Sequence, residues 1–164
     1  MASKKRFGLA TFLLLAMSSV FAQEQPLIVD AEPAWDIEYF GDKVPFYSLT
    51  RQDNGDSQLM FHRWPVRGSK EQIPTLLGDI AQRFAEEMGS GWTKLVIKDG
   101  YALESIAGNE FSGEAAIFSS RLGFVQTMFM ISDGDGLWFG QFNGPKAMWS
   151  EAVAVLNNLQ RNPG

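Results

Sequence analysis

Apolar and polar residues alternate in short runs along much of the chain, and this pattern predicts β-strands. Residues 35–39 alternate with a period of two, as a strand with one buried face does. Comparable runs follow at residues 46–50 and 58–64. The Asn54-Gly55 pair between these two runs is a strong hairpin signal, so we expect them to be antiparallel neighbours.

A second group of strands is predicted in the C-terminal half. The run at residues 122–131 is apolar on both faces, which is typical of a central strand with layers above and below it. Asp133-Gly134-Asp135-Gly136 predicts a tight turn after it. The connections in this half are too short for parallel crossovers, so the sheet should be mostly antiparallel. The expected strands are residues 93–98, 101–106, 110–119, 122–131 and 137–142.

Two segments place apolar residues at helical spacing. Between residues 69 and 88 they recur at steps of three and four, and Ser69 with Gln72 fits a capping box. A second helix is predicted to begin at Pro145, since proline suits the first helical position. Three strands, a helix, five strands and a helix make an α+β domain built on a mostly antiparallel sheet.

The N-terminal residues differ in composition from the rest. Lys4, Lys5 and Arg6 precede an apolar run, and small residues before Gln23 fit a cleavage site, as in a secretory signal peptide. The run is about 14 residues long and a membrane-spanning helix needs about 20, so a retained anchor is the weaker alternative. We therefore expect a periplasmic or extracellular protein with no membrane span after cleavage. Its expected parts are a signal peptide at 1–22, an extended leader at 23–34, a domain at 35–160 and a tail at 161–164.

Charge and residue content narrow the function classes. The chain has 14 Lys and Arg against 19 Asp and Glu, a formal charge of −5. Removing residues 1–22 takes away three basic residues and leaves −8, with no basic cluster, so a nucleic-acid partner is not expected. Zero cysteine excludes disulfides, thiolate nucleophiles and iron–sulfur clusters, and the single His62 excludes sites that need two imidazoles. We expect no cofactor.

Few residues suggest catalysis, and each of them also has a structural interpretation. His62 could act as a general base with a carboxylate, or pack as a histidine on a half-buried strand. Glu110 and Glu114 would share one face of a strand, which fits either paired catalytic carboxylates or a solvated surface. Motifs for a serine nucleophile, a zinc protease or a phosphate loop do not occur. The sequence therefore predicts that the protein is not an enzyme.

Asp133-Gly134-Asp135 begins like a calcium-binding loop. Counting from Asp133, the sixth and twelfth positions would be Trp138 and Gly144, where such a loop needs glycine and glutamate. The segment is therefore predicted to be a hairpin turn, and no metal site is expected.

Aromatic residues provide the candidate binding site. Trp64 precedes Pro65 at a strand end and Trp92 follows a glycine, and tryptophan is least completely covered at such places. Tryptophan and arginine are the residues that anchor protein interfaces. We predict a partner- or ligand-binding patch that includes Arg63, Trp64, Arg67 and Trp92, with ordinary packing as the alternative.

The chain resembles the PsbP-like family, which includes PsbP of photosystem II, Mog-type Ran-binding proteins and bacterial exported relatives. The resemblance covers nearly all of residues 35–160. It lies in the first strands with the long helix after Ser69, in the strand around Phe111-Ser112-Gly113-Glu114-Ala115-Ala116, and in the final strand and helix. It implies a three-layer α/β/α sandwich and a non-enzymatic role in binding another protein. The family has no common catalytic motif, so no residue roles are transferred.

The function predicted from these observations is an exported, non-enzymatic protein-interaction or assembly module. One alternative is a periplasmic binder of an apolar small molecule or lipid, in a cavity lined by adaptable methionines. Its lining would include Met128, Phe129, Met130 and Met148. The other alternative is a hydrolase that uses His62 with a carboxylate.

Overall fold

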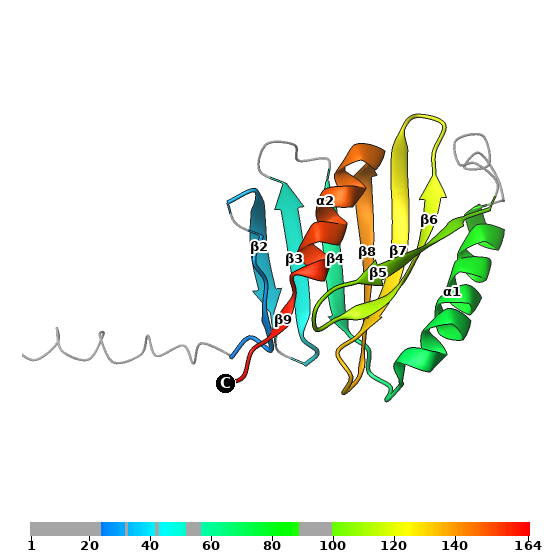
Figure 1. The fold of residues 1–164 in the computed structure, drawn as a ribbon. Coiled ribbons are helices and arrows are strands. Elements are labelled where there is room, and N and C mark those ends of the chain that lie inside the picture. Colours follow the sequence, from blue (N-terminus) through cyan, green and yellow to red (C-terminus); the bar gives the residue numbers. More distant parts are fainter. Residues whose placement is uncertain (1–23, 32, 42, 52–56, 89–99) are drawn as a thin grey trace, which may run out of the picture.

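The computed structural model describes residues 24–31, 33–41, 43–51, 57–88 and 100–164. Within them the chain forms a mixed α+β fold with a large antiparallel sheet and two α-helices (Figure 1). The helices are α1 (Ile73–Met88), preceded by the 3-10 turn η1 (Lys70–Gln72), and α2 (Lys146–Asn157). The strands are β1 (Leu27–Ile28), β2 (Trp35–Phe40), β3 (Phe46–Arg51), β4 (Gln58–Arg63), β5 (Ala102–Ala107), β6 (Ser112–Ser119), β7 (Phe124–Ser132), β8 (Leu137–Pro145) and β9 (Gln160–Arg161).

The larger sheet has seven strands in the order β2-β3-β4-β8-β7-β6-β5, and each neighbouring pair is antiparallel. Strand β8 lies between β4 and β7, so it joins the N-terminal strands to the C-terminal ones. The expected antiparallel α+β architecture is confirmed. The interior position of β7, between β8 and β6, also agrees with its two apolar faces.

The two helices pack against different side chains of the same strands. Helix α1 packs over β6 and β7, where Leu77 and Ala81 share a buried cluster with Met128. Helix α2 contributes Trp149 and Leu156 to another cluster. This second cluster contains Phe129, which directly follows Met128 in β7. Successive side chains of a strand point to opposite faces, so the two helices cover opposite faces of the sheet.

Some element bounds differ from the sequence-based ones. The strand expected at residues 110–119 begins at Ser112, and the last helix begins at Lys146, with Pro145 ending β8 and occupying the N-cap position. The capping box at Ser69 is confirmed, because its backbone N–H donates to Gln72 Oε1 at 2.9 Å. The expected signal peptide, the Asn54-Gly55 turn and the strand at 93–98 lie outside the described residues.

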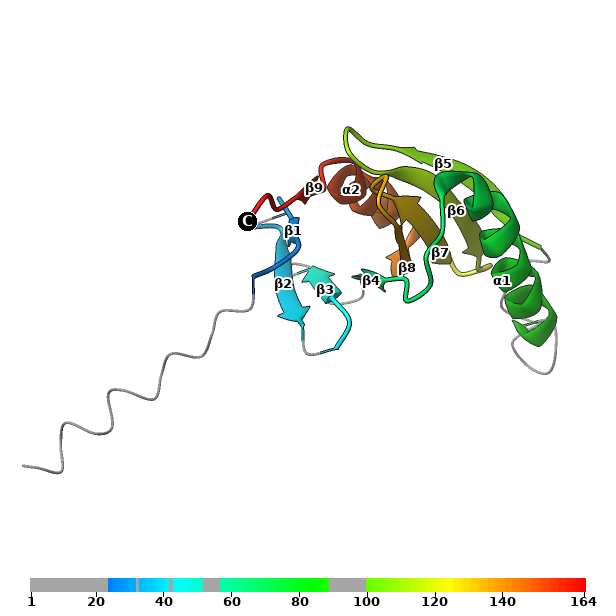
Figure 2. The same cartoon turned by 90° about the horizontal axis from the view of Figure 1, so that it is seen from below.

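The described residues of the leader form part of the folded structure. Leu27 and Ile28 pair antiparallel with Arg161 and Gln160, so β1 and β9 make a small second sheet (Figure 2). The Asn162 backbone N–H donates to the Pro26 carbonyl, and its side-chain amide donates to the Gln25 carbonyl, both at 2.9 Å. These contacts anchor the described part of the leader to the C-terminal tail.

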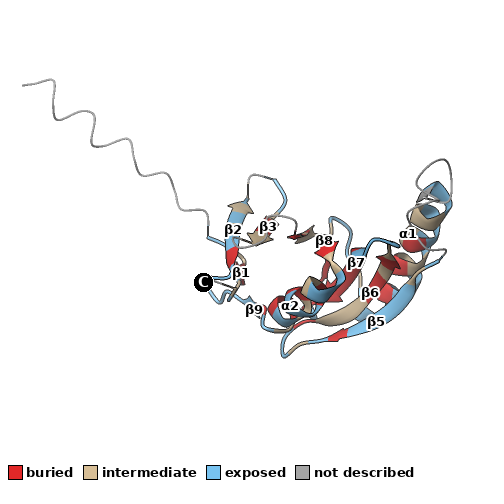
Figure 3. Ribbon diagram, turned by 90° about the horizontal axis from the view of Figure 1, so that it is seen from above, coloured by how far each residue is buried: buried red, intermediate tan, exposed pale blue. Residues whose placement is uncertain are grey.

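Burial is greatest on the strands at the middle of the sheet (Figure 3). Seven of the nine residues of β7 are buried, whereas Ile106 is the one buried residue of the edge strand β5. Among the described residues, no helix is long and apolar enough to cross a membrane.

Candidate functional site: a pocket at one end of the sheet

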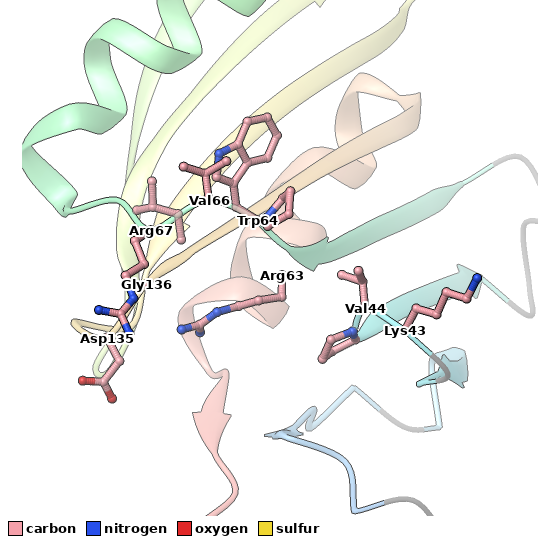
Figure 4. A pocket seen from close by; sticks show the side chains of 11 residues that line it. Lys43, Val44, Arg63, Trp64, Val66, Arg67, Asp135 and Gly136 are labelled. Carbon is pink, nitrogen blue, oxygen red and sulfur yellow. The ribbon is translucent and has the colours of Figure 1, made fainter.

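A pocket of about 420 Å³ opens where the β2–β3 connection, the segment after β4 and the β7–β8 turn meet (Figure 4). Three of the four predicted site residues, Arg63, Trp64 and Arg67, line it. The fourth, Trp92, lies outside the described residues. The other lining residues come from the two turns and from the chain beside Trp64: Lys43, Val44, Pro45, Pro65, Val66, Asp135, Gly136 and Leu137.

Backbone hydrogen bonds hold the pocket segments together. The Arg63 N–H donates to the Pro45 carbonyl at 3.0 Å, and the Trp64 N–H donates to the Leu137 carbonyl at 2.8 Å. These bonds extend the β3–β4 and β4–β8 ladders to the end of the sheet. The pocket is therefore built on the ends of paired strands, which makes it more rigid than a site made of free loops.

The Arg63 side chain is fixed from two sides. Its Nη1 donates to Asp133 Oδ2 at 2.5 Å, and its guanidinium carbon lies 5.5 Å from the centre of the Trp138 ring. Trp138 is buried and donates its indole N–H to the same Asp133 oxygen at 3.1 Å. The charge of Arg63 is thus largely satisfied within the protein.

Asp133 also organises the turn beside the pocket. Its Oδ1 accepts the backbone N–H groups of Asp135 and Gly136, each at 2.9 Å, and Gly134 has a φ of +87°. The predicted hairpin turn is confirmed. Burial acts to raise the pKa of Asp133, but the hydrogen bonds from Trp138 and the Asp135 N–H, together with the Arg63 charge, outweigh it and lower the pKa.

Gly136 has a steric role in the pocket wall. A Cβ at this position would clash with the guanidinium group of Arg63. Glycine therefore gives the Arg63 side chain the space it needs to reach Asp133.

The rim combines apolar and cationic side chains. Val44 is 40% exposed and Val66 is 64% exposed. Lys43 and Arg67 are also exposed, and neither forms an ion pair within the described part of the chain. The carboxylate of Asp135, by contrast, is paired with Arg161 Nη1 at 2.8 Å. Figure 4 shows the Lys43 amine pointing away from Trp64, so Arg67, beside Val66, is the cation placed to meet a carboxylate next to an apolar group.

His62 lies in an aromatic stack beside the pocket. Its Nδ1 is 3.0 Å from the Arg63 carbonyl oxygen, and its ring centre lies 6.4 Å from that of Trp64 and 5.9 Å from that of Phe139. No carboxylate among the described residues forms a hydrogen bond with it. This geometry does not support a general base for the hydrolase alternative.

The two glutamates do not form the pair suggested by their spacing. Glu110 lies in the turn before β6, where its Oε2 accepts the Arg161 backbone N–H at 2.8 Å. Glu114 lies within β6, opposite Ser105 and Met130. The expectation that they share one strand is wrong, because the chain does not enter the strand until Ser112.

The methionines of the lipid-binding alternative lie on opposite faces of the sheet. Met128 and Met130 are buried on the α1 side, whereas Met148 packs against the cluster that contains Phe129 on the α2 side. The sheet separates them, so they do not line one common cavity.

A second pocket, which the sequence did not suggest, has a volume of about 500 Å³. It lies between the start of α1 and strands β5 and β6, where Lys70, Glu71 and Glu114 contribute charged side chains. Its walls come from segments about 40 residues apart in the sequence, so no local sequence pattern predicts this pocket. Within the described part of the chain, no group of three or more His, Cys, Asp or Glu residues is placed to hold a metal ion.

Neither the models of known protein families nor the curated proteins include a match to this chain.

Proposed function

We propose that the protein is an exported, non-enzymatic interaction module that binds a segment of another protein in the pocket around Trp64. The observation that carries the proposal is the combination, at one pocket rim, of exposed apolar side chains with two cations that form no ion pair among the described residues. Val44 and Val66 provide the apolar part, and Lys43 and Arg67 provide the charge. The resemblance to the PsbP-like family supports this role and a three-layer α/β/α arrangement of the domain.

The charges of the pocket define the partner segment. Arg63 is neutralised by Asp133, and Asp135 is paired with Arg161, so Lys43 and Arg67 carry the available positive charge. A carboxylate that binds there would be partly removed from water, where a charge-assisted hydrogen bond is stronger than a neutral one. The partner is thus a chain segment that presents an acidic group next to an apolar side chain.

We propose that this binding takes place outside the cytoplasm, in the periplasm or the extracellular medium. A basic stretch, an apolar run and small residues at the expected positions support export through a cleaved signal peptide. The domain has no disulfide, because the chain has no cysteine, so its stability in that compartment comes from its packed core.

Site-specific crosslinking tests the proposal. The full chain, expressed with its own leader, carries a photoreactive amino acid in place of Val66, and a control carries it in place of Leu122. Leu122 is 74% exposed and lies in the β6–β7 turn. A partner that crosslinks at position 66 but not at 122, and whose yield falls in Arg67→Glu, supports the proposal. Equal crosslinking at both positions, or a yield unchanged by Arg67→Glu and Trp64→Ala in stable variants, refutes it.

A further inference from the structure

On one half of a sheet face, the described helices reach only the end at Phe139, which packs against the clusters that contain Leu77 and Ile73 of α1. Helix α1 packs chiefly over β6 and β7, whereas β2, β3 and β4 form the opposite end of the strand order (Figures 1 and 2). On the α2 face, Leu49 and Phe61 of these strands are fully buried. Their neighbours Ser48 and Met60 point to the opposite face and are only half-buried. Strands β2, β3, β4 and β8 thus form an open face on the side opposite α2.

A row of rings crosses the open face in strict register. Phe40 pairs with Phe46, Phe46 with His62, and His62 with Phe139. The ring centres are 5.8 Å apart for Phe40 and Phe46 and 5.9 Å apart for His62 and Phe139. Phe40, at the sheet edge, is 53% exposed. Since neighbouring strands lie about 4.8 Å apart, the row spans about 15 Å.

Hydrogen-bonding side chains lie next to the rings on the same face. The sheet register aligns them in two rows that cross β3, β4 and β8. The row next to the rings contains Ser48, Met60 and Gln141, and the following row contains Thr50, Gln58 and Asn143. Neither row contains a charged side chain, and Met60 is the one apolar member. The uncharged polar residues are Ser48, Thr50, Gln58, Gln141 and Asn143.

We propose that this open face binds a neutral oligosaccharide. A sugar ring has an apolar C–H face that packs on aromatic rings, and hydroxyl groups that exchange hydrogen bonds with amides. The ring row and the polar rows supply both kinds of contact side by side. Charge agrees with the same ligand class, because the polar rows on β3, β4 and β8 contain no charged side chain that would select an ionic ligand.

Other ligands for an aromatic sheet face fit less well. An apolar helix laid on the face would cover Gln141, Asn143 and Thr50 without returning hydrogen bonds to them, which costs free energy. A single-stranded nucleic acid also stacks on aromatic rings, but it needs cations along its backbone. The acidic Glu38 at the edge of the face would instead repel its phosphates.

This inference does not depend on the proposed protein-binding pocket. The two surfaces are neighbours, since Trp64 of the pocket packs on Phe139 with ring centres 5.6 Å apart. They use different chemistry, however, because the pocket offers cations and the open face offers amides and rings. Arg67 in the pocket and Phe40 and Gln141 on the open face are not part of this ring contact, so variants at these three positions report on each surface separately.

Titration with defined neutral oligosaccharides tests the proposal. Cellohexaose, maltohexaose and chitohexaose are added up to millimolar concentration to the full chain, and binding is measured by calorimetry and by NMR shifts. We expect at least one of them to bind, with shifts confined to β2, β3, β4 and β8. Phe40→Ala and Gln141→Ala should each weaken this binding about tenfold, because one removes a ring contact and the other an amide.

Matched controls keep the result clear. Leu122→Ala removes an exposed apolar side chain from the β6–β7 turn, and Gln82→Ala removes an exposed amide from α1, so both should bind as the unaltered protein does. Arg67→Glu should also leave sugar binding intact while it reduces crosslinking at position 66. The proposal is refuted if none of the three sugars binds, or if they bind equally well to the folded Phe40→Ala and Gln141→Ala variants. NMR shifts that lie elsewhere on the protein would overturn it as well.

Discussion

The hydroxyl group of Tyr47 makes two hydrogen bonds with the backbone of Leu27. It accepts the Leu27 N–H at 3.0 Å and donates to the Leu27 carbonyl at 3.3 Å. Tyr47 lies in β3 and is fully buried, and Leu27 lies in β1, which pairs with the C-terminal strand β9. A single phenol thus connects the large sheet to the leader and, through β9, to the end of the chain.

Removing this hydroxyl should loosen the N-terminal segment. Tyr47→Phe keeps the buried ring but leaves the Leu27 backbone groups without these partners, a loss of about 1–3 kcal/mol in the free energy of unfolding. Urea denaturation measures the loss, and hydrogen exchange at residues 24–31 locates it. Tyr39→Phe is the control, because Tyr39 is half-buried with its ring 4.9 Å from that of Tyr47. Equal effects of the two substitutions would contradict the role given to the Tyr47 hydroxyl.

Alkaline pH should act on the same contact. Burial, which outweighs the hydrogen bond with Leu27, raises the pKa of Tyr47 from 10.0 to about 12. The protonated phenol is therefore favoured in the folded state, and its contribution is fully present below pH 10 and is lost as pH rises toward 12. Denaturation at a series of pH values should show this loss in the unaltered protein. The loss should be smaller in Tyr47→Phe, and identical profiles would rule out Tyr47 as its source.

Asp133 should be important for stability near neutral pH. Asp133→Asn removes the charge that faces Arg63, and we expect a loss of about 3 kcal/mol, in the range for breaking a largely buried ion pair. Because the pKa of Asp133 is lowered in the folded protein, its contribution is present above pH 3.8 and is lost as pH falls below that value. Thermal unfolding at pH 7 and pH 3 checks both points. Asp135→Asn, which breaks an exposed pair with Arg161, should cost at most about 1 kcal/mol.

One substitution should stabilise the protein. Thr127 is fully buried in β7, and its hydroxyl has no hydrogen-bond partner among the described residues. Thr127→Val keeps a similar shape and removes the unpaired polar group, so the free energy of unfolding should rise by about 1 kcal/mol. Thr75→Val, at an exposed position of α1, should not raise it. A lower stability of Thr127→Val would mean that the hydroxyl is paired after all.

Two glycines should respond to alanine in opposite ways. Gly136→Ala places a methyl group against the Arg63 guanidinium, so it should weaken the Arg63–Asp133 pair and reduce crosslinking at position 66. Gly78 lies in α1 with no atom near its missing Cβ, and Gly78→Ala should stabilise the helix by about 1 kcal/mol. Unfolding curves and crosslinking yields of both variants check this contrast. If Gly136→Ala behaved like Gly78→Ala, the Arg63 side chain would not need the space.

Local patterns in the sequence predicted most of the described elements. Strands β2, β3 and β4 begin at the residues where alternation begins, and α1 ends at Met88 as expected. The prediction succeeds for these elements because the repeat of a strand or a helix can be recognised from residues that are close together in the sequence. Arg63, Trp64 and Arg67 could be grouped for the same reason, since they lie within five positions of each other. Their shared pocket preserves that local proximity.

Contacts between distant segments were decided by the tertiary structure alone. The insertion of β8 between β4 and β7 brings Asp135 and Gly136 to Arg63, and the β3–β4 pairing adds Lys43 and Val44 to the same pocket. The docking of β1 on β9 likewise joins segments more than 130 residues apart. The ring row of the open face depends on the register of four strands. Local sequence patterns located most strands of the large sheet, although β6 begins two residues later than expected and β1 and β9 were not foreseen as strands. Strand order and register depend instead on which faces bury most surface together, a property of the whole sheet.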